Sequence, residues 1–593
     1  MLNRIWALLA FIFAVLTIFT GRLLFLQVVS AAELLERSKE NISVKRRIIP
    51  LRGRILARDG TVLADNRIAS DLMYFGGEIE HWEKLRYLLG LADTPAEPDS
   101  SDPIESKQGK ALAYNISDDL VPAVEELVAG QSNLYVRKRL ERVYPTGLAA
   151  HVVGYTAEAQ GKFAGYAIND LVGITGIEES FQSELFGTPG SRTVKVDNRG
   201  VDILTQEYKS AKPGEDIVLT IDPAIQKMAE DVLANSLGYI NEQRLEREYD
   251  FEEVLHGAMI VLDPNNGEIL AMASHPSYDQ NVFTKRPSDP KKVSELLSDR
   301  KNMPLQNRAV QAYPPASTFK LVTSSTILED GFVSADKKYA CSAKLRYGGI
   351  TWENWAPYDR GNYNVVEAIA DSCNTYFWRV AIDTPDFKQG WAPYIESLTK
   401  RAFEFGYGKE VGIGLDEEKA GRIPTEEWSI SAMNRSWRPG DSLNVSIGQG
   451  DVLATPIQVV QLVETIAEDG VQYKPHLVKS IAANQTQISS KKIEGRYWSI
   501  LKKGMRHMIT DHGTSRLLGP AANFPVKIAG KTGTAQNSKG LGYEHVWFAG
   551  FAPLDNPEIV LVIFVEHGDR STAVAVPMAR DFFVKYFGVE DEN

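Results

Sequence analysis

A serine and a lysine stand three positions apart in the stretch AYPPASTFKLV, just after two prolines. Proline is excluded from a helix interior but can precede a helix. We therefore predict a helix of about four turns that has Ser317 in its first turn and stops at Gly331. Positions i and i+3 share one helix face, so the Lys320 amine would lie beside the Ser317 hydroxyl.

This pair could perform nucleophilic catalysis. A serine hydroxyl is a poor nucleophile until a neighbouring base takes its proton. A lysine that is desolvated and close to another cation can have a pKa low enough to act as that base. The alternative is an ordinary helix start, with a capping serine and a surface lysine. The pair alone does not distinguish the two interpretations.

Two further motifs favour catalysis. ADSCNTYF contains Ser372, Cys373 and Asn374, and IAGKTGTAQ contains Lys531, Thr532, Gly533 and Thr534. S-x-x-K, followed by an S-x-N type triplet and by K-T-G, is the signature of penicillin-binding proteins and class A β-lactamases. All three motifs are present here in that order.

The chain resembles the class B penicillin-binding proteins, which are membrane-anchored peptidoglycan transpeptidases. The resemblance covers nearly the whole sequence, including RGRILARDGTVLADN, GITGIEESFQSELFGTPG, GAMIVLDPNNGEILAMASHP and SIGQGDVLATPIQ. Within the class, FGYGKEVGIGLDEEKAGRIPTEEW and IGQG are most similar to the elongation-type enzymes, the penicillin-binding protein 2 branch. The division-type (septal) branch is the alternative.

The resemblance implies roles for the first two motifs and for the lysine of the third. Ser317 would be the acylated nucleophile and Lys320 its base. Ser372 would relay a proton to the leaving amine, and Asn374 would bind the substrate amide. Lys531 would set a positive field near Ser372 and the substrate carboxylate.

The rest of the third motif would bind substrate. The hydroxyls of Thr532 and Thr534 would hold the substrate carboxylate, and Gly533 would let the substrate backbone lie against the strand edge. The backbone N–H groups of Ser317 and Thr534 would form an oxyanion hole. Ala316 stands where the family more often has glycine, which we take as a small change.

The implied reaction has two steps. A stem peptide ending in D-Ala-D-Ala acylates the serine and releases D-alanine, and the amine of a second stem peptide then forms the cross-link. β-Lactam antibiotics would mimic the donor. No cofactor or metal is implied. Because no glycan-polymerising segment is recognised, the resemblance implies a SEDS-type (RodA-like) glycosyltransferase and other elongation-complex proteins as partners.

Three other functions are compatible with the motifs in principle. A β-lactam hydrolase and a penicillin sensor use the same fold, but the long N-terminal region resembling that of the transpeptidases argues against both. A non-enzymatic scaffold that activates a polymerase is disfavoured because all three motifs are intact. Glu178, in the segment that would link the N-terminal region to the catalytic domain, is interpreted as structural.

Length and composition fit a multidomain protein. The chain has 593 residues and a formal net charge of -12, which argues against a nucleic-acid partner. We predict an α+β fold: an antiparallel sheet with packed helices after an elongated β-rich N-terminal pedestal. The predicted domains are residues 1–30 (anchor), 31–250 (pedestal, of the dimerisation type, with an inserted head at about 68–140) and 251–593 (transpeptidase).

The first 30 residues predict a membrane anchor. Ile5–Gly21 is apolar, and Arg22 could extend to the interface while the helix continues to Val29. A cleaved signal peptide ending near VSAA is the alternative. Arg4 favours an inner-membrane protein with a single span and an extracytoplasmic (periplasmic) catalytic domain. The polar segment Ala31–Arg47 reads as a helix or stalk.

Periodicity places further elements around the motifs. GAMIVLDPNNGEILAMASHP predicts a hairpin, and RILARDGTVLADN predicts two strands around Asp59-Gly60. VKVDNRGVDI and DIVLTID predict strands, and PAIQKMAEDVLANSL a helix. VKIAGKTGTAQ, HVWFAGFAP and EIVLVIFVEH predict three buried antiparallel strands, followed by a helix in AVPMARDFFVKYFG.

The sequence leaves two local features open. Cys373 could be a packed residue, a disulfide partner of Cys341 or, with Asp359 and Cys341, a metal ligand. Trp352 and Trp355 could line the site or pack in the core.

Overall fold

The computed structural model describes residues 2–30, 43–95, 98, 109–159, 163, 165–167, 170–196, 202–246, 256–510, 525–536 and 543–589. The chain forms two compact units. The first comprises Met1–Gly53 with Phe186–Gly214, and the second comprises Arg54–Leu185 with Glu215–Asn593.

The first unit contains the N-terminal helix and a small sheet. Helix α1 (Leu2–Leu24) continues into a π-helical turn (Phe25–Val29). Within the described part of the chain, Arg4–Val28 is the one helical stretch long and apolar enough to cross a membrane. The antiparallel sheet has the order β1-β8-β9, with the bounds Ser43–Ile48, Gly190–Val196 and Asp202–Lys209.

Strand β1 corrects part of the predicted helix or stalk. Residues 43–47 of that prediction lie in β1, while residues 31–42 lie outside the described residues. The strand consists mostly of exposed polar residues, so it carries no local strand pattern. The β conformation of this segment comes from antiparallel pairing with β8, which lies nearly 150 residues further along the chain. A prediction from the neighbouring residues alone does not include that partner.

The second unit begins with a mixed seven-stranded sheet. Its order is β19-β18-β10-β2-β3-β4, and β5 also pairs with β3. The bounds are Asn484–Gln485, Val478–Ile481, Ile217–Leu219, Ile55–Leu56, Val62–Tyr74, Lys110–Ile116 and Leu134–Val143. The turn at Asp59-Gly60 therefore joins two strands as predicted. Pairing of β10 with β18 ties this sheet to the C-terminal half of the chain.

Part of this region has its own hydrophobic core. Leu72, Leu85 and Val124 belong to a cluster separate from the main core. Helices α3 (Trp82–Leu89) and α5 (Val121–Val128) cover it. The cluster falls inside the predicted head at about 68–140, whose boundaries, like those of the other domains, remain predictions.

A buried ion pair stabilises the segment that follows β5. Arg142 on β5 donates a hydrogen bond to Glu178 on α7 (Gly176–Ser180) over 2.7 Å, and neither side chain is exposed. Removing one partner of such a pair leaves an uncompensated buried charge. This placement fits the structural interpretation of Glu178.

The C-terminal half is built on a five-stranded antiparallel sheet of order β12-β11-β23-β22-β21. The bounds are Ile269–His275, Gly257–Leu262, Ile559–Val565, His545–Ala552 and Ala529–Ala535. Side chains alternate between faces, so Ile260 and Met259 enter two different core clusters. The predicted hairpin and the three predicted C-terminal strands are confirmed.

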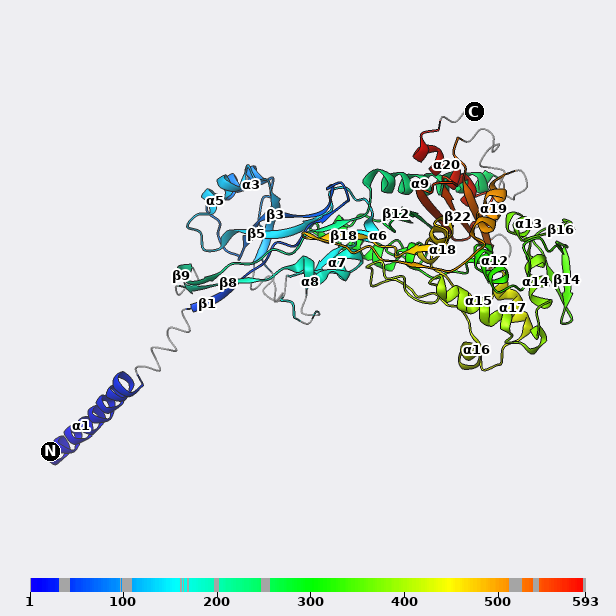
Figure 1. Ribbon diagram of the computed structural model, residues 1–593. Helices are drawn as coiled ribbons and strands as arrows, with labels where there is room; N and C mark the ends of the chain where they lie inside the picture. The colour runs from blue at the N-terminus through cyan, green and yellow to red at the C-terminus, as the bar shows by residue number, and fades with distance from the viewer. Residues whose placement is uncertain are drawn as a thin grey trace. The chain divides into compact units, whose positions relative to one another are not determined.

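Helices cover both faces of this sheet (Figure 1). One face packs on α9 (Pro223–Glu246) and α20 (Ala575–Phe587), both predicted as helices. The other packs on α12 (Lys320–Glu329) and α18 (Pro456–Ala467). A sheet buried on both faces explains why its strands are almost continuously apolar.

The remaining elements surround this core. Further helices are α6 Ala150–Val153, α8 Gln182–Phe186, α10 Asn281–Thr284, α11 Pro290–Ser298, α13 Val365–Ala370, α14 Asn374–Ile382, α15 Pro393–Glu404, α16 Glu426–Met433, α17 Pro439–Ser446 and α19 Trp498–Ile509. Two-stranded sheets pair β6 Thr156–Glu158 with β7 Leu171–Gly173, β13 Tyr339–Ala340 with β16 Asn362–Tyr363, β14 Lys344–Tyr347 with β15 Ile350–Glu353 and β17 Val471–Tyr473 with β20 Ser490–Lys492.

Candidate active site

The three motifs come from separate elements and meet at one place. Ser317 lies in a short 3-10 turn, η3 (Ala316–Thr318), and Lys320 opens the buried helix α12. Ser372 lies between α13 and α14, and Asn374 is the first residue of α14. Lys531 to Thr534 lie on β21, which packs against η3.

Both motif lysines contact the hydroxyl of Ser372. Lys531 Nζ donates to Ser372 Oγ over 3.0 Å, and Lys320 Nζ donates to the same atom over 3.3 Å. Lys320 Nζ also donates to the Ser372 carbonyl over 2.7 Å and to Asn374 Oδ1. Both lysines are fully buried. Because both amines contact the same hydroxyl in a site shielded from water, a proton can pass from one amine to the other through that hydroxyl.

The surroundings lower the pKa of both amines. Burial lowers the Lys320 pKa well below its ordinary value, and the nearby charge of Lys531 lowers it further. Burial lowers the Lys531 pKa to about 7, although the carboxylate of Asp371 opposes this. A lysine with a lowered pKa can be a neutral base near physiological pH.

The predicted contact between Ser317 and Lys320 differs from the observed one. Within the described residues, the hydrogen bonds of Lys320 go to the second motif rather than to Ser317. Ser317 is partly exposed, whereas Lys320 is buried. Hydrogen bonds of catalytic groups often form or tighten only when substrate is bound, so this geometry is compatible with Lys320 acting as the base.

The backbone before Ser317 corrects the predicted helix start. Ala316 has a φ of +49°, in the left-handed region, so the α-helix begins only at Lys320. The Ala316 N–H donates to the Gly448 carbonyl over 2.9 Å. A Cβ on Gly448 would lie 2.2 Å from the Ala316 carbonyl, so the serine turn needs glycine there. Because a left-handed alanine costs about 1–2 kcal/mol, Ala316 is more than a small change.

Strand β21 presents the rest of the third motif. Thr534 is exposed, its hydroxyl donates to Ser571 Oγ over 3.3 Å, and its carbonyl accepts from Gln449 Nε2 over 3.4 Å. Thr532 is mostly buried, and its N–H donates to Met508 Sδ over 3.1 Å. Gln449 lies in the IGQG stretch, where the resemblance alone gave no reason to expect this contact.

Gly533 also packs closely against the serine turn, while its predicted role toward the substrate backbone stays a prediction. A Cβ there would lie 3.2 Å from the Pro315 carbonyl and 3.3 Å from the Thr318 methyl. The missing side chain thus lets the serine turn pack onto β21. Among the described strands β21 is also at the sheet edge, so the strand still offers backbone groups for pairing.

The structure decides the open cysteine and tryptophan questions. Cys341 and Cys373 form a disulfide, with their Cα atoms 6.0 Å apart. The described residues hold no group of three or more His, Cys, Asp or Glu side chains placed to bind a metal. Trp352 packs against Trp378, whereas Trp355 is half exposed and donates to the Asp371 carbonyl.

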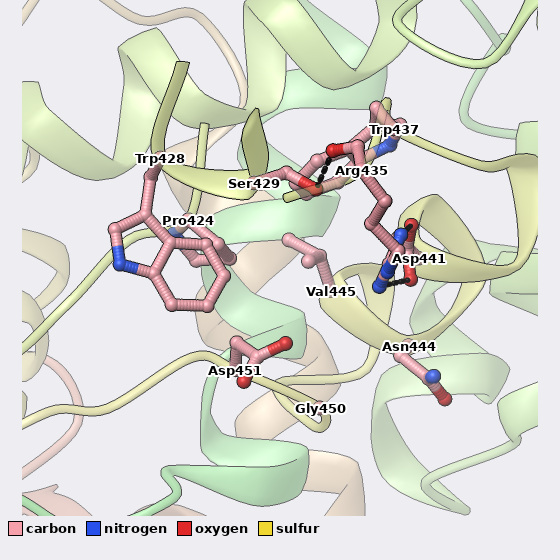
Figure 2. A pocket seen from close by; sticks show the side chains of 10 residues that line it. All are labelled: Pro424, Trp428, Ser429, Arg435, Trp437, Asp441, Asn444, Val445, Gly450 and Asp451. Carbon is pink, nitrogen blue, oxygen red and sulfur yellow. Dashed lines mark hydrogen bonds and ion pairs between the residues drawn. The ribbon is translucent and has the colours of Figure 1, made fainter. Parts of the chain in front are cut away.

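A separate small pocket of about 30 Å³ lies between α16 and α17 (Figure 2). It is lined by Trp428, Arg435, Asp441 and Asp451 among others, and by none of the motif residues. Arg435 pairs with Asp441 across one wall. Proximity of the motif side chains, rather than this pocket, identifies the candidate active site.

Comparisons with known proteins agree with the geometry. Residues 257–583 match the penicillin binding protein transpeptidase domain, and residues 47–219 match the penicillin-binding protein dimerisation domain. The chain is 30% identical to the peptidoglycan D,D-transpeptidase MrdA of Haemophilus influenzae, over 94% of this chain and 87% of the relative. It is also 30% identical to MrdA of Escherichia coli K12, over 93% and 89%.

Solved structures extend the match to the whole fold. One, described as the structural coordination of polymerization and crosslinking by a peptidoglycan synthase complex, is 39% identical with a TM-score of 0.81, covering 100% of this chain and 99% of that one. PBP2 of Helicobacter pylori in complex with MreC is 25% identical with a TM-score of 0.75, covering 92% and 99%. The chain therefore belongs to the penicillin-binding protein transpeptidase family, as a class B D,D-transpeptidase most similar to the elongation-type enzymes.

Proposed function

We propose that the protein cross-links peptidoglycan stem peptides during cell-wall elongation, through an acyl-enzyme on Ser317. The observation that carries this proposal is the pair of buried lysines that both reach Ser372 Oγ, next to the serine turn. A proton relay beside a partly exposed serine is what serine acyl transfer requires. The elongation role follows the relatives named MrdA.

In the first step, Ser317 Oγ attacks the carbonyl of the penultimate D-alanine, and neutral Lys320 takes its proton. The C–N bond to the terminal D-alanine then breaks, and Ser372 passes a proton to the leaving amine. The Lys531 charge and the hydroxyls of Thr532 and Thr534 hold the carboxylate of that residue. The Ser317 and Thr534 N–H groups stabilise the oxyanion, a contribution of about 3–4 kcal/mol per donor in comparable sites.

In the second step, the amine of a neighbouring stem peptide attacks the acyl-enzyme where D-alanine departed. The relay runs in reverse, and Ser372 and Lys320 return the proton to Ser317. Asn374 holds the amide of the acyl group. A β-lactam acylates Ser317 in the same way, but its leaving group remains attached.

The partner assignment deepens the same proposal. The related synthase complex coordinates polymerization with crosslinking, and the Helicobacter pylori relative was solved with MreC. We extend both associations to this chain and propose a SEDS-type polymerase and an MreC-like scaffold as its partners. Helix α1 would anchor the chain as a single span in the inner membrane, with the catalytic domain on the extracytoplasmic side.

The test is a covalent adduct. Full-length protein in detergent is incubated with benzylpenicillin, digested and analysed by mass spectrometry, beside Ser317→Ala. We expect a stable adduct on the peptide containing Ser317 and none in the variant.

A control separates loss of the nucleophile from loss of the fold. Ser298→Ala changes an exposed serine at the end of α11 and should form the adduct normally. An adduct that is released quickly while penicillin is consumed would indicate a hydrolase instead. No adduct on folded wild-type protein would refute the acyl-enzyme and favour a scaffold.

A further inference from the structure

Residues 339–363, which we call the strap, are fastened to the second motif at several points. The strap contains two pairs of short strands, β13 with β16 and β14 with β15. In Figure 1, β14 and β16 lie beside α13 and α14, the helices that flank Ser372. The disulfide joins Cys341 of the strap to Cys373, the residue between Ser372 and Asn374.

A second attachment holds the residue before Ser372. Arg360 donates to both oxygens of Asp371, from Nε over 2.6 Å and from Nη2 over 2.7 Å. The Tyr363 hydroxyl donates to Asp371 Oδ2 over 2.6 Å, and Trp355 Nε1 donates to the Asp371 carbonyl over 2.9 Å. The Asp371 side chain is only 3% exposed. A two-point arginine–carboxylate contact fixes orientation as well as position.

A third attachment holds the residue after Cys373. The Asn374 N–H donates to Asn354 Oδ1 over 3.0 Å, and Asn354 Nδ2 points to Cys341 Sγ at 3.5 Å. Asn374 begins α14, and Cys373 before it makes no side-chain cap. The strap therefore supplies a hydrogen-bond acceptor for an N–H at the start of this helix.

These attachments surround a strained residue. Ser372 has a φ of +53°, in the left-handed region that non-glycine residues rarely adopt. Such a conformation persists only where neighbouring structure determines it. In this conformation the Ser372 hydroxyl accepts hydrogen bonds from both Lys320 and Lys531.

We propose that the strap is a positioning element for acyl transfer, in which Arg360 and the Cys341–Cys373 bridge hold Ser372 in its left-handed conformation between the two lysines. The strap acts through Asp371, Cys373 and Asn374 and need not touch the substrate. This inference rests on the proposed function, because its consequence is measured as acylation of Ser317.

Removing Arg360 should also change the pKa of Lys531, an effect that removing a purely structural residue would not have. The charged groups around Lys531 are Lys320, from α12, and Asp371, which raises the Lys531 pKa. Arg360 neutralises Asp371, so removing Arg360 strengthens the pull of that carboxylate on Lys531. The Lys531 pKa should then rise.

The experiment measures the second-order rate of penicillin acylation against pH, on full-length protein in detergent, together with the melting temperature. We expect Arg360→Ala to lower the rate at least tenfold and to shift the pH limb due to Lys531 upward. Arg360→Lys keeps the charge but loses the two-point contact, so its pH limb should stay near that of wild type while its rate is only partly restored.

The Cys341–Cys373 disulfide allows a second, independent test of the proposal. The double variant Cys341→Ala with Cys373→Ala changes no charge, so we expect a lower rate with an unshifted pH limb. Lys344→Ala is the matched control, because it breaks an exposed strap ion pair with Glu353 that does not touch the second motif.

Specific outcomes overturn the inference. Unchanged rates in folded Arg360→Ala and in the cysteine double variant would refute positioning. A loss in Arg360→Ala that follows the melting temperature, with an unshifted pH limb, would reduce the strap to a structural element. If Arg360→Ala fails to fold, the acylation rates of Arg360→Lys and of the cysteine double variant test the inference in its place. Absence of acylation in wild type and in Lys344→Ala would instead refute the proposed function.

Discussion

Lys531 donates a hydrogen bond to Ser372 Oγ over 3.0 Å, although 159 positions separate the two residues in the chain. The contact joins the edge strand of the sheet to the loop between α13 and α14. It also places a second amine on the hydroxyl that Lys320 already reaches. The proton relay therefore depends on tertiary packing at a junction of three elements.

The pH dependence of acylation should be bell-shaped. Lys531, whose pKa is about 7, loses its charge as the pH rises through that value, so the substrate carboxylate loses attraction and the rate falls. At the acid side, protonation of Lys320 removes the base, and this limb lies well below the ordinary lysine pKa. Stopped-flow acylation with a chromogenic β-lactam from pH 4 to pH 10, a range of about 6 units, measures both limbs.

Substituting Lys531 by arginine tests the alkaline limb. The arginine keeps its charge throughout this range, so the fall near pH 7 should vanish even if the maximum rate is lower. Persistence of the same alkaline limb in folded Lys531→Arg would contradict its assignment to Lys531.

Ser372→Ala should slow acylation without abolishing it. The variant removes the shared hydroxyl but leaves Ser317 in place, and loss of one proton-transfer group typically costs about 10²–10⁴-fold in rate. Ser298→Ala, at an exposed serine at the end of α11, provides a comparison. An acylation rate equal to that of wild type would show that Ser372 is not on the proton path.

Ala316→Gly should stabilise the fold or leave it unchanged. Relief of the left-handed strain at φ +49° is worth about 1–2 kcal/mol, against about 0.5–1 kcal/mol of added backbone entropy in the unfolded chain. The expected gain is up to about 1.5 kcal/mol by chemical denaturation. Ala123→Gly is the control, because Ala123 is an exposed residue within helix α5 and the substitution should only lose stability. Equal destabilisation of both variants would refute the strain.

Glu464 should destabilise the fold as the pH rises. It is fully buried on α18, and burial raises its pKa to about 9 against an ordinary value of 4.5. Between these values the unfolded chain has already released the proton that the folded protein retains. Stability therefore falls with pH across this window, by roughly 1.4 kcal/mol per pH unit at most.

Glu464→Gln should remove this dependence, because the amide keeps the acceptor for the Tyr473 N–H without titrating. Unfolding by urea at pH 5 and pH 8 compares the two proteins. Glu427→Gln, at an exposed position, is the control. An identical pH dependence in wild type and in Glu464→Gln would contradict a protonated buried carboxyl.

Much of the site could be predicted from the sequence because its motifs are local. The Ser317–Lys320 spacing and the triplet at Ser372 are each read within a few residues. The K-T-G stretch is also local, and its strand was predicted from the β-branched and aromatic residues of the three C-terminal segments. The helix that follows Ser317 ends near Gly331, as the pattern indicated, because a left-handed glycine is a local signal.

Only the tertiary structure decided how these pieces act on one another. The left-handed Ala316 follows from its contact with Gly448, and strand β1 follows from its pairing with β8. The disulfide, the Arg360–Asp371 contact and the lowered lysine pKa values depend on which distant groups are buried together. Residue type and spacing determine which chemistry is available, whereas desolvation and charge proximity depend on packing across the whole fold.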